Sequence, residues 1–274
     1  MQPRLARQLK DVILLALLMV LVAPFLLVFV WMALASFQTS LQITGWPPTI
    51  LFRPTLENYE RVLGSLPIGQ YTLNSIVVSV SATAIGLLLG VPAAYAIARW
   101  RLGRIAAILL STRMVPWISF LLPWYLIFSF LGLTGGHLTL IVTHLIITIP
   151  MATWLLIGFF EDLPQDLEDA ALIDGCSHFG AFVRILTPLV APGIAAAAIL
   201  SLIYSWNNYI FALILAGPQA RTLPIAVTAF ISHEGVDWGA TLAAATLLTL
   251  PILVLALALQ RYFVRGLALG GLKG

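Results

Sequence analysis

The side chains that could do chemistry in this sequence lie in an acidic segment and at a few polar positions inside apolar stretches. The acidic segment, residues 161–192, holds six of the eleven acids, namely Glu161, Asp162, Asp166, Glu168, Asp169 and Asp174. Carboxylates this dense disfavour a helix that lies on anionic lipid. We therefore predict that the segment binds another protein, with an interfacial helix on lipid as the alternative.

Arg113 is a charge deep inside an apolar stretch, about nine residues from its start. At ~1.5 Å per helical residue its depth is on the order of 12 Å, where a charge costs at least ~2.5 kcal/mol and normally faces a protein interior or a wet path. Its partner could be backbone carbonyls freed by Pro116, an acid on another protein or an anionic group of a solute. A structural arginine that snorkels to the membrane surface is the alternative to a path residue.

A polar and aromatic cluster interrupts another apolar stretch at Trp206, Asn207, Asn208 and Tyr209. Amide side chains in hydrocarbon need hydrogen-bonding partners. Aromatic rings stack on sugar rings and amides bond hydroxyl groups, which makes the cluster a candidate substrate path. Hydrogen bonding to a partner helix is the alternative.

We expect no catalytic residue, no metal site and no enzymatic activity. A phosphate-binding loop needs Gly, four residues and then Gly-Lys-Ser/Thr, whereas the only lysines are Lys10 and Lys273. The four histidines have no Cys or acid at metal-ligand spacing, and no serine has the context of a hydrolase nucleophile. ATP-driven work would therefore require a separate ATPase.

Composition predicts an all-α membrane protein. The 274 residues are 61% apolar and 9% charged, with a mean hydropathy of +1.02, whereas a soluble domain is about 25% charged. Long unbroken apolar runs disfavour a β-barrel. Six runs are long enough to cross a bilayer, at approximately 12–35, 73–98, 105–131, 138–160, 193–216 and 240–262.

The basic residues predict the orientation. With a cytoplasmic N-terminus, the inner pieces hold ten Lys and Arg residues and the outer pieces three, which is the expected inside bias. Both termini and the loop at 161–192, between spans four and five, are then cytoplasmic. We expect one transmembrane domain over 1–274 with a core at about 71–262, a coupling loop at 161–192 and a cytoplasmic tail at 263–274.

The acidic segment carries signals for two short helices. Gly175 is placed as a C-terminal cap of the first, and Ser177 can cap the second. The second has apolar residues at helical spacing, and we expect Thr187, Pro188 and Pro192 to end it.

The same segment resembles the EAA loop of permease subunits in bacterial ABC importers. That pattern is Glu-Ala-Ala, three residues, Gly, nine residues, Ile, one residue and Leu-Pro. Here Asp169-Ala170-Ala171 is followed by Gly175 and by Ile185-Leu186-Thr187-Pro188. Asp169 replaces Glu and Thr187 replaces Leu, while the glycine and the terminal proline keep their places.

The rest of the chain is similar to the MalG-like carbohydrate-uptake permeases, from about Pro24 to Gly274. The similar stretches include Ala93-Ala94-Tyr95-Ala96 with Ala98-Arg99, Trp206-Asn207, and a tail that begins at Gln260.

The resemblance implies a permease subunit of a sugar importer in a bacterial or archaeal inner membrane. It implies a second homologous permease, two copies of a cytoplasmic ATPase that bind ATP and Mg, and an extracytoplasmic sugar-binding protein, with no cofactor on this chain. Membrane lipid is an expected partner and nucleic acid is not. A stand-alone ion-coupled transporter and an intramembrane enzyme are the alternative functions.

The resemblance also assigns candidate residues. Those for ATPase coupling are Asp169, Ala170, Ala171, Asp174, Gly175, Phe179, Phe182, Ile185 and Pro188, and those for a tail contact with the ATPase are Arg265, Gly266 and Lys273.

Overall fold

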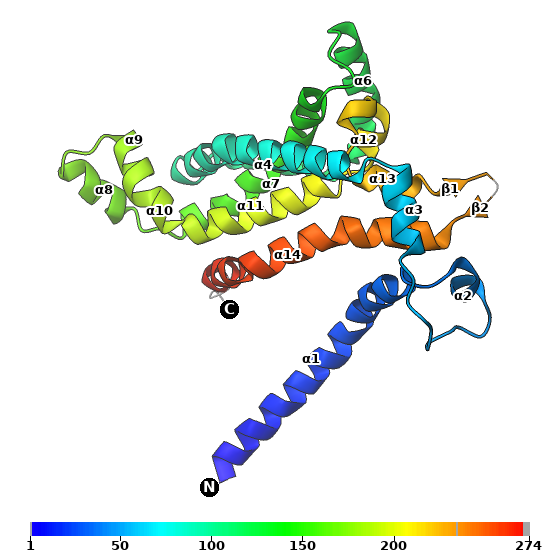
Figure 1. Cartoon of the computed structure of the whole chain (residues 1–274). Coiled ribbons are helices and arrows are strands. Elements are labelled where there is room, and N and C mark those ends of the chain that lie inside the picture. The colour runs from blue at the N-terminus through cyan, green and yellow to red at the C-terminus, as the bar shows by residue number, and fades with distance from the viewer. Residues whose placement is uncertain (1, 234, 271–274) are drawn as a thin grey trace. The chain divides into compact units, whose positions relative to one another are not determined.

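The computed structural model describes residues 2–233 and 235–270, with side chains described for 10–233 and 235–258. Its elements (Figure 1) are α1 (Gln2–Ala35), α2 (Ser40–Thr44), α3 (Glu57–Ser65), α4 (Ile68–Arg99), α5 (Gly103–Met114), the 3₁₀ helix η1 (Trp117–Phe120), α6 (Leu121–Phe130), α7 (His137–Glu161), α8 (Asp166–Ile173), α9 (His178–Ala181), the π-helical turn η2 (Phe182–Leu186), α10 (Thr187–Leu189), α11 (Ala191–Trp206), α12 (Ile210–Leu215), the 3₁₀ helix η3 (Pro218–Ala220), α13 (Pro224–Thr228), β1 (Ile231–Ser232), β2 (Gly235–Val236) and α14 (Trp238–Gly270). Contacts divide the chain into two units, residues 1–67 with 226–249 and residues 68–225 with 250–274.

Among the described residues, four helices are long and apolar enough to cross a membrane, in α1, α4, α7 and α14. Two bent pairs bring the number to as many as six. The predicted third span at 105–131 is one of these bent pairs, with a bend of 93° between Met114 and Trp117. Pro116 explains the break, since Val115 before it takes an extended conformation that a helix does not allow. The predicted fifth span at 193–216 is likewise divided between α11 and α12.

In the first unit, Asn58 on α3 holds the end of α1. Its side-chain amide donates hydrogen bonds to the carbonyls of Ser36 and Gln38, at 2.8 and 2.7 Å. Asn58 is buried and lies against Gly239 at the start of α14, where a side chain would collide with its amide. This one side chain therefore joins three segments that are far apart in the sequence.

A second link in this unit is ionic. Arg61 on α3 bonds Asp237 at 2.5 Å and Glu57 at 2.7 Å. Partial burial alone would raise the pKa of Asp237, but the hydrogen bonds from Arg61 and from the Ala240 amide outweigh burial and lower it. The stabilisation from this carboxylate is present above its unfolded pKa and is lost as pH falls through the lower folded value.

The second unit is organised around α4, α7 and α11, which pack side by side (Figure 1). Their small residues permit a close approach, as is common between membrane helices. Gly86 and Gly90 on α4 face Thr148 and Ala152 on α7, and a Cβ on Gly86 would lie 2.5 Å from the Thr148 hydroxyl oxygen. That hydroxyl donates to the carbonyl of Ala82 at 3.0 Å, which ties the helices together.

The packing of α4 on α7 predicts opposite effects of two Gly→Ala substitutions. Gly86→Ala should overpack this contact, at a cost of about 1–3 kcal/mol, and lower the apparent Tm of the detergent-purified protein. Gly158→Ala in α7 is the matched control, because its Cβ would meet no atom within 4 Å and alanine gains up to ~1 kcal/mol over glycine in a helix. Equal shifts in Tm for the two variants would contradict this packing.

Candidate functional site

The acidic segment folds as two short helices joined at a glycine. α8 ends at Ile173, and Gly175 takes a φ of +87°, a conformation that L residues rarely adopt. Ser177 then caps α9, its hydroxyl accepting a hydrogen bond from the Gly180 amide at 3.1 Å. The sequence predictions of a glycine turn and a serine cap are confirmed.

The predicted end of the second helix is wrong at Thr187 and Pro188, whereas the bend just before Pro192 agrees with the prediction. Thr187 and Pro188 do not stop it, and the helix runs through the π turn η2 into α10 before it bends by 75° ahead of α11. A π turn accommodates Pro188, whose ring would crowd an α-helical carbonyl one turn earlier. The Thr187 hydroxyl also donates to the Phe182 carbonyl at 2.7 Å and closes the wide turn.

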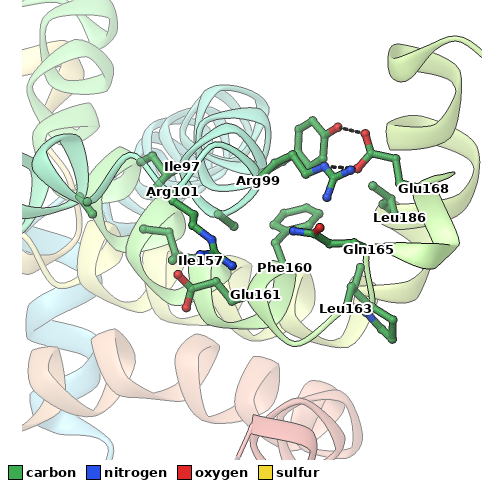
Figure 2. A pocket seen from close by; sticks show the side chains of 15 residues that line it. Ile97, Arg99, Arg101, Ile157, Phe160, Glu161, Leu163, Gln165, Glu168 and Leu186 are labelled. Atoms are coloured by element: carbon green, nitrogen blue, oxygen red, sulfur yellow. Dashed lines mark hydrogen bonds and ion pairs between the residues drawn. The ribbon is translucent and has the colours of Figure 1, made fainter.

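Glu168 anchors this segment to α4, although sequence reasoning did not select it as a site residue. It is buried, with only 4% of its side chain exposed, and its carboxylate accepts from Arg99 Nε at 2.9 Å and from the Tyr95 hydroxyl at 2.7 Å (Figure 2). His178 Nδ1 lies 3.2 Å from the same carboxylate. The sequence did single out the stretch that contains Tyr95 and Arg99. That Glu168 on α8 binds these two residues became apparent only from the three-dimensional fold.

Aromatic packing completes the anchor. Tyr95 packs against Phe160 of α7 and Phe182 of η2, with ring centroids 5.7 and 4.8 Å away, and the two phenylalanine rings are themselves 6.3 Å apart. Leu186 is buried in the same cluster. The second short helix is therefore fixed to α4 and α7 through one face.

The predicted coupling residues divide by exposure. Ala171 is buried, and Phe182 and Ile185 are partly buried. The others are exposed, namely Asp169, Ala170, Asp174, Gly175, Phe179 and Pro188. Phe179 is 74% exposed and Ile173 is 85% exposed, so the segment presents apolar side chains as well as carboxylates on its surface.

A cavity of about 450 Å³ lies beside this anchor, between the ends of α4 and α7 and the starts of α5 and α8. Arg99 and Glu168 bound one side, and Figure 2 shows Arg101 and Glu161 pointing toward one another on another side.

Burial predicts that Glu168 and Asp169 contribute unequally. Glu168→Gln should weaken the docking of α8 by about 2–3 kcal/mol, less than the ~3–5 kcal/mol of a fully buried pair because Arg99 is 22% exposed. Hydrogen exchange of residues 166–189 should then be roughly 30- to 150-fold faster. Asp169→Asn is the control, since its 59% exposed carboxylate is 3.4 Å from Arg99 and contributes at most ~1 kcal/mol. Equal exchange in both variants would exclude this anchor.

Arg113 lies in the last turn of α5, and its guanidinium is 4.9 Å from the centre of the Trp154 ring. It makes no hydrogen bond or ion pair with any residue that the structure describes. It also lines a small cavity of about 70 Å³ together with Trp117, Met151 and Tyr204.

The Trp206 to Tyr209 cluster is the break between α11 and α12. The side-chain oxygen Oδ1 of Asn208 accepts from the Phe211 backbone N–H at 3.1 Å, and the side-chain Nδ2 of Asn207 donates to the Ile203 backbone carbonyl at 2.9 Å. The two amides therefore satisfy backbone groups at the helix ends. Trp206 and Asn208 are buried, Tyr209 is partly buried and Asn207 is exposed.

The predicted tail residues lie at or beyond the limit of the described side chains. Arg265 and Gly266 lie in α14 beyond the described side chains, and Lys273 lies outside the described residues. Among the described residues, no group of three or more His, Cys, Asp or Glu side chains is placed to hold a metal ion.

Comparison with known proteins gives consistent matches. The family model for the binding-protein-dependent transport system inner membrane component matches residues 86–269. The sulfoquinovosyl glycerol transport system permease protein SmoH of Agrobacterium fabrum is 33% identical over 89% of this chain and 88% of its own length. The trehalose/maltose transport system permease protein MalG of Thermococcus litoralis is 34% identical, over 90% and 91%.

The fold is also that of a solved transporter. A chain of a bacterial ABC transporter involved in the import of the acidic polysaccharide alginate superposes with a TM-score of 0.70 at 19% identity, covering 95% of this chain and 97% of that chain. This likeness, together with the extent of the family match, supports the same conclusion as the helix pattern. The chain belongs to the family of binding-protein-dependent transport system inner membrane components, and it is a transport subunit rather than an enzyme.

Proposed function

We propose that this chain forms half of the translocation path of an ATP-driven carbohydrate importer and that α8 to α10 receive the motion of a separate ATPase. The observation that carries the coupling role is the construction of the acidic segment. Buried Glu168 fixes the segment to α4, and Ile173, Phe179 and several carboxylates remain exposed.

This construction suits the transmission of force. Exposed apolar side chains beside charged groups form the kind of surface that a protein partner covers. A displacement of that surface acts on α4 through the Arg99 to Glu168 pair and on α7 through the Phe160, Tyr95 and Phe182 rings. Since α4 and α7 pack closely, they would move together with α11.

Carbohydrate as the substrate class is supported by the relatives. SmoH and MalG are named for transport of sulfoquinovosyl glycerol and of trehalose or maltose. Each matches nearly the whole length of this chain, so the shared region includes both helix breaks and the acidic segment. We expect the binding protein to determine in large part which sugar is transported.

The proposed assembly contains this chain, a second homologous permease, two ATPase copies that hold ATP and Mg, and an extracytoplasmic sugar-binding protein. Both termini and the acidic segment face the cytoplasm of a bacterial or archaeal cell, as the basic residues favour. The outer segment at residues 37–72, which includes α3, is the proposed surface for the binding protein. Arg265, Gly266 and Lys273 are proposed to reach the ATPase pair.

The proposed docking surface predicts the effect of removing one exposed side chain. Ile173→Ser should reduce co-purification of the ATPase with the permease by roughly tenfold, because a buried apolar anchor contributes about 1.5–3 kcal/mol. Leu41→Ser is the control, since Leu41 in α2 is also 85% exposed but lies in the proposed outer segment. ATPase capture that survives Ile173→Ser, or that is lost with both variants, would contradict the assignment.

The dependence on an external motor predicts that transport stops without nucleotide. In vesicles that contain the complete complex and its binding protein, sugar uptake should require ATP and should be lost in Gly175→Pro, because proline cannot take the positive φ of this turn. Uptake by this chain alone, without the ATPase or ATP, would overturn the proposed function.

A further inference from the structure

Two helix breaks of the second unit meet in space. α5 ends at Met114, and extended Val115 and Pro116 lead into Trp117. α11 ends at Trp206, two residues after Tyr204. The Trp117 and Tyr204 rings are 5.9 Å apart and nearly perpendicular, at 88°, so each break contributes one ring to a shared surface.

The chemistry of a bilayer restricts what can lie at such a place. Backbone outside a helix is tolerated at membrane depth only where it is buried in protein or lines a water-filled cavity, since lipid offers no hydrogen bonds. The surface at the two breaks therefore faces protein or water. Arg113 lies at the same place, two residues before Val115, which agrees with the rule that intramembrane charges mark wet or interior positions.

Arg113 is held in position without being neutralised. Its guanidinium carbon lies over the Trp154 ring, 4.9 Å from the ring centre, in a cation–π contact that uses none of its five N–H donors. No acceptor from the described residues takes those donors. The adjacent cavity has a buried floor of Ile147 and Met151, each 5% exposed, and open sides of Trp117 and Tyr204, which are 36% and 41% exposed.

We propose that Arg113, Trp117 and Tyr204 form a subsite for an acidic sugar, in which the guanidinium binds the anionic substituent and the two rings contact the sugar ring. The assignment rests on the proposed function, since it names the substrate class of that path. A planar guanidinium matches a carboxylate or sulfonate through two parallel hydrogen bonds. Half-exposed aromatic rings offer the apolar faces and edges on which a pyranose packs.

The second break supplies groups for the hydroxyls of the same sugar. Tyr204 and Asn207 are three residues apart and both exposed, so they lie on neighbouring positions of one helix face. The Asn207 amide uses one of its hydrogens on the Ile203 carbonyl, which leaves its oxygen and its other hydrogen for a ligand. The guanidinium of Arg113, the ring of Tyr204 and the amide of Asn207 therefore offer three kinds of contact to one ligand.

Measuring sugar binding to the permeases without the binding protein tests the subsite independently of the selectivity of that protein. The probes are methyl glucuronide and methyl glucoside, which differ by a carboxylate, and the protein is the detergent-purified complex of permeases and ATPase without the binding protein. The wild type should bind the glucuronide roughly 10- to 100-fold more tightly, as charge-assisted hydrogen bonds give. Arg113→Ala should remove that preference, and Arg113→Lys should retain part of it.

Two further variants distinguish the contribution of the Arg113 charge from that of the aromatic rings. Arg104→Ala removes an exposed arginine from the first turn of the same helix and should bind both sugars as the wild type does. Trp117→Leu should weaken both sugars by the same factor, because the ring contacts do not involve the carboxylate. This variant tests the subsite even where Arg113→Ala fails to assemble.

Three outcomes overturn the subsite: equal or no binding of the two sugars by the wild type, an equal loss of both in Arg113→Ala, and wild-type binding in Trp117→Leu. Repeating the measurement in nanodiscs of phosphatidylcholine and of phosphatidylglycerol tests a lipid phosphate as the occupant. Loss of the preference in phosphatidylglycerol alone would assign Arg113 to lipid and also overturn it. ATPase capture on the same samples reports separately on the proposed function, because Ile173 and not Arg113 determines it.

Discussion

The ion pair between Arg99 and Glu168 is the interaction on which the acidic segment of this subunit depends. Glu168 is nearly inaccessible, so its charge is tolerable only while Arg99 and Tyr95 satisfy it. The pair joins the last residue of a membrane helix to the first turns of a short surface helix. It therefore fixes where α8 sits, which in turn decides which side chains of the segment remain exposed.

The acids of α8 illustrate how neighbours in sequence acquire different roles. Asp169 aligns with the acid of the family pattern and is exposed, whereas Glu168 beside it is buried. The exposed acid is accessible and makes only a 3.4 Å contact with Arg99, whereas the buried one holds the helix to α4. A helix that turns by about 100° per residue makes such a division possible within two adjacent positions.

Much of this organisation was predictable from the sequence, and the failures have physical causes. Apolar runs located the membrane helices, and Gly175 and Ser177 located a turn and a cap, because these signals are local. The size of the bend after Met114 was not predicted, because a count of apolar residues does not register the conformational restriction that Pro116 places on Val115. Glu168 was missed because its burial depends on Arg99, which is 69 residues away in the sequence.

The π turn at Phe182–Leu186 has a consequence for angular register. Each residue of an α-helix advances by about 100°, and a π turn takes up one residue more than an α turn would. The helix before the turn, which carries Phe179, is therefore rotated relative to the helix after it, which enters α10 and the Pro188 position. Shortening this turn by one residue would preserve a continuous helix and every exposed side chain, yet it would point the outward-facing ring in a different direction around the axis.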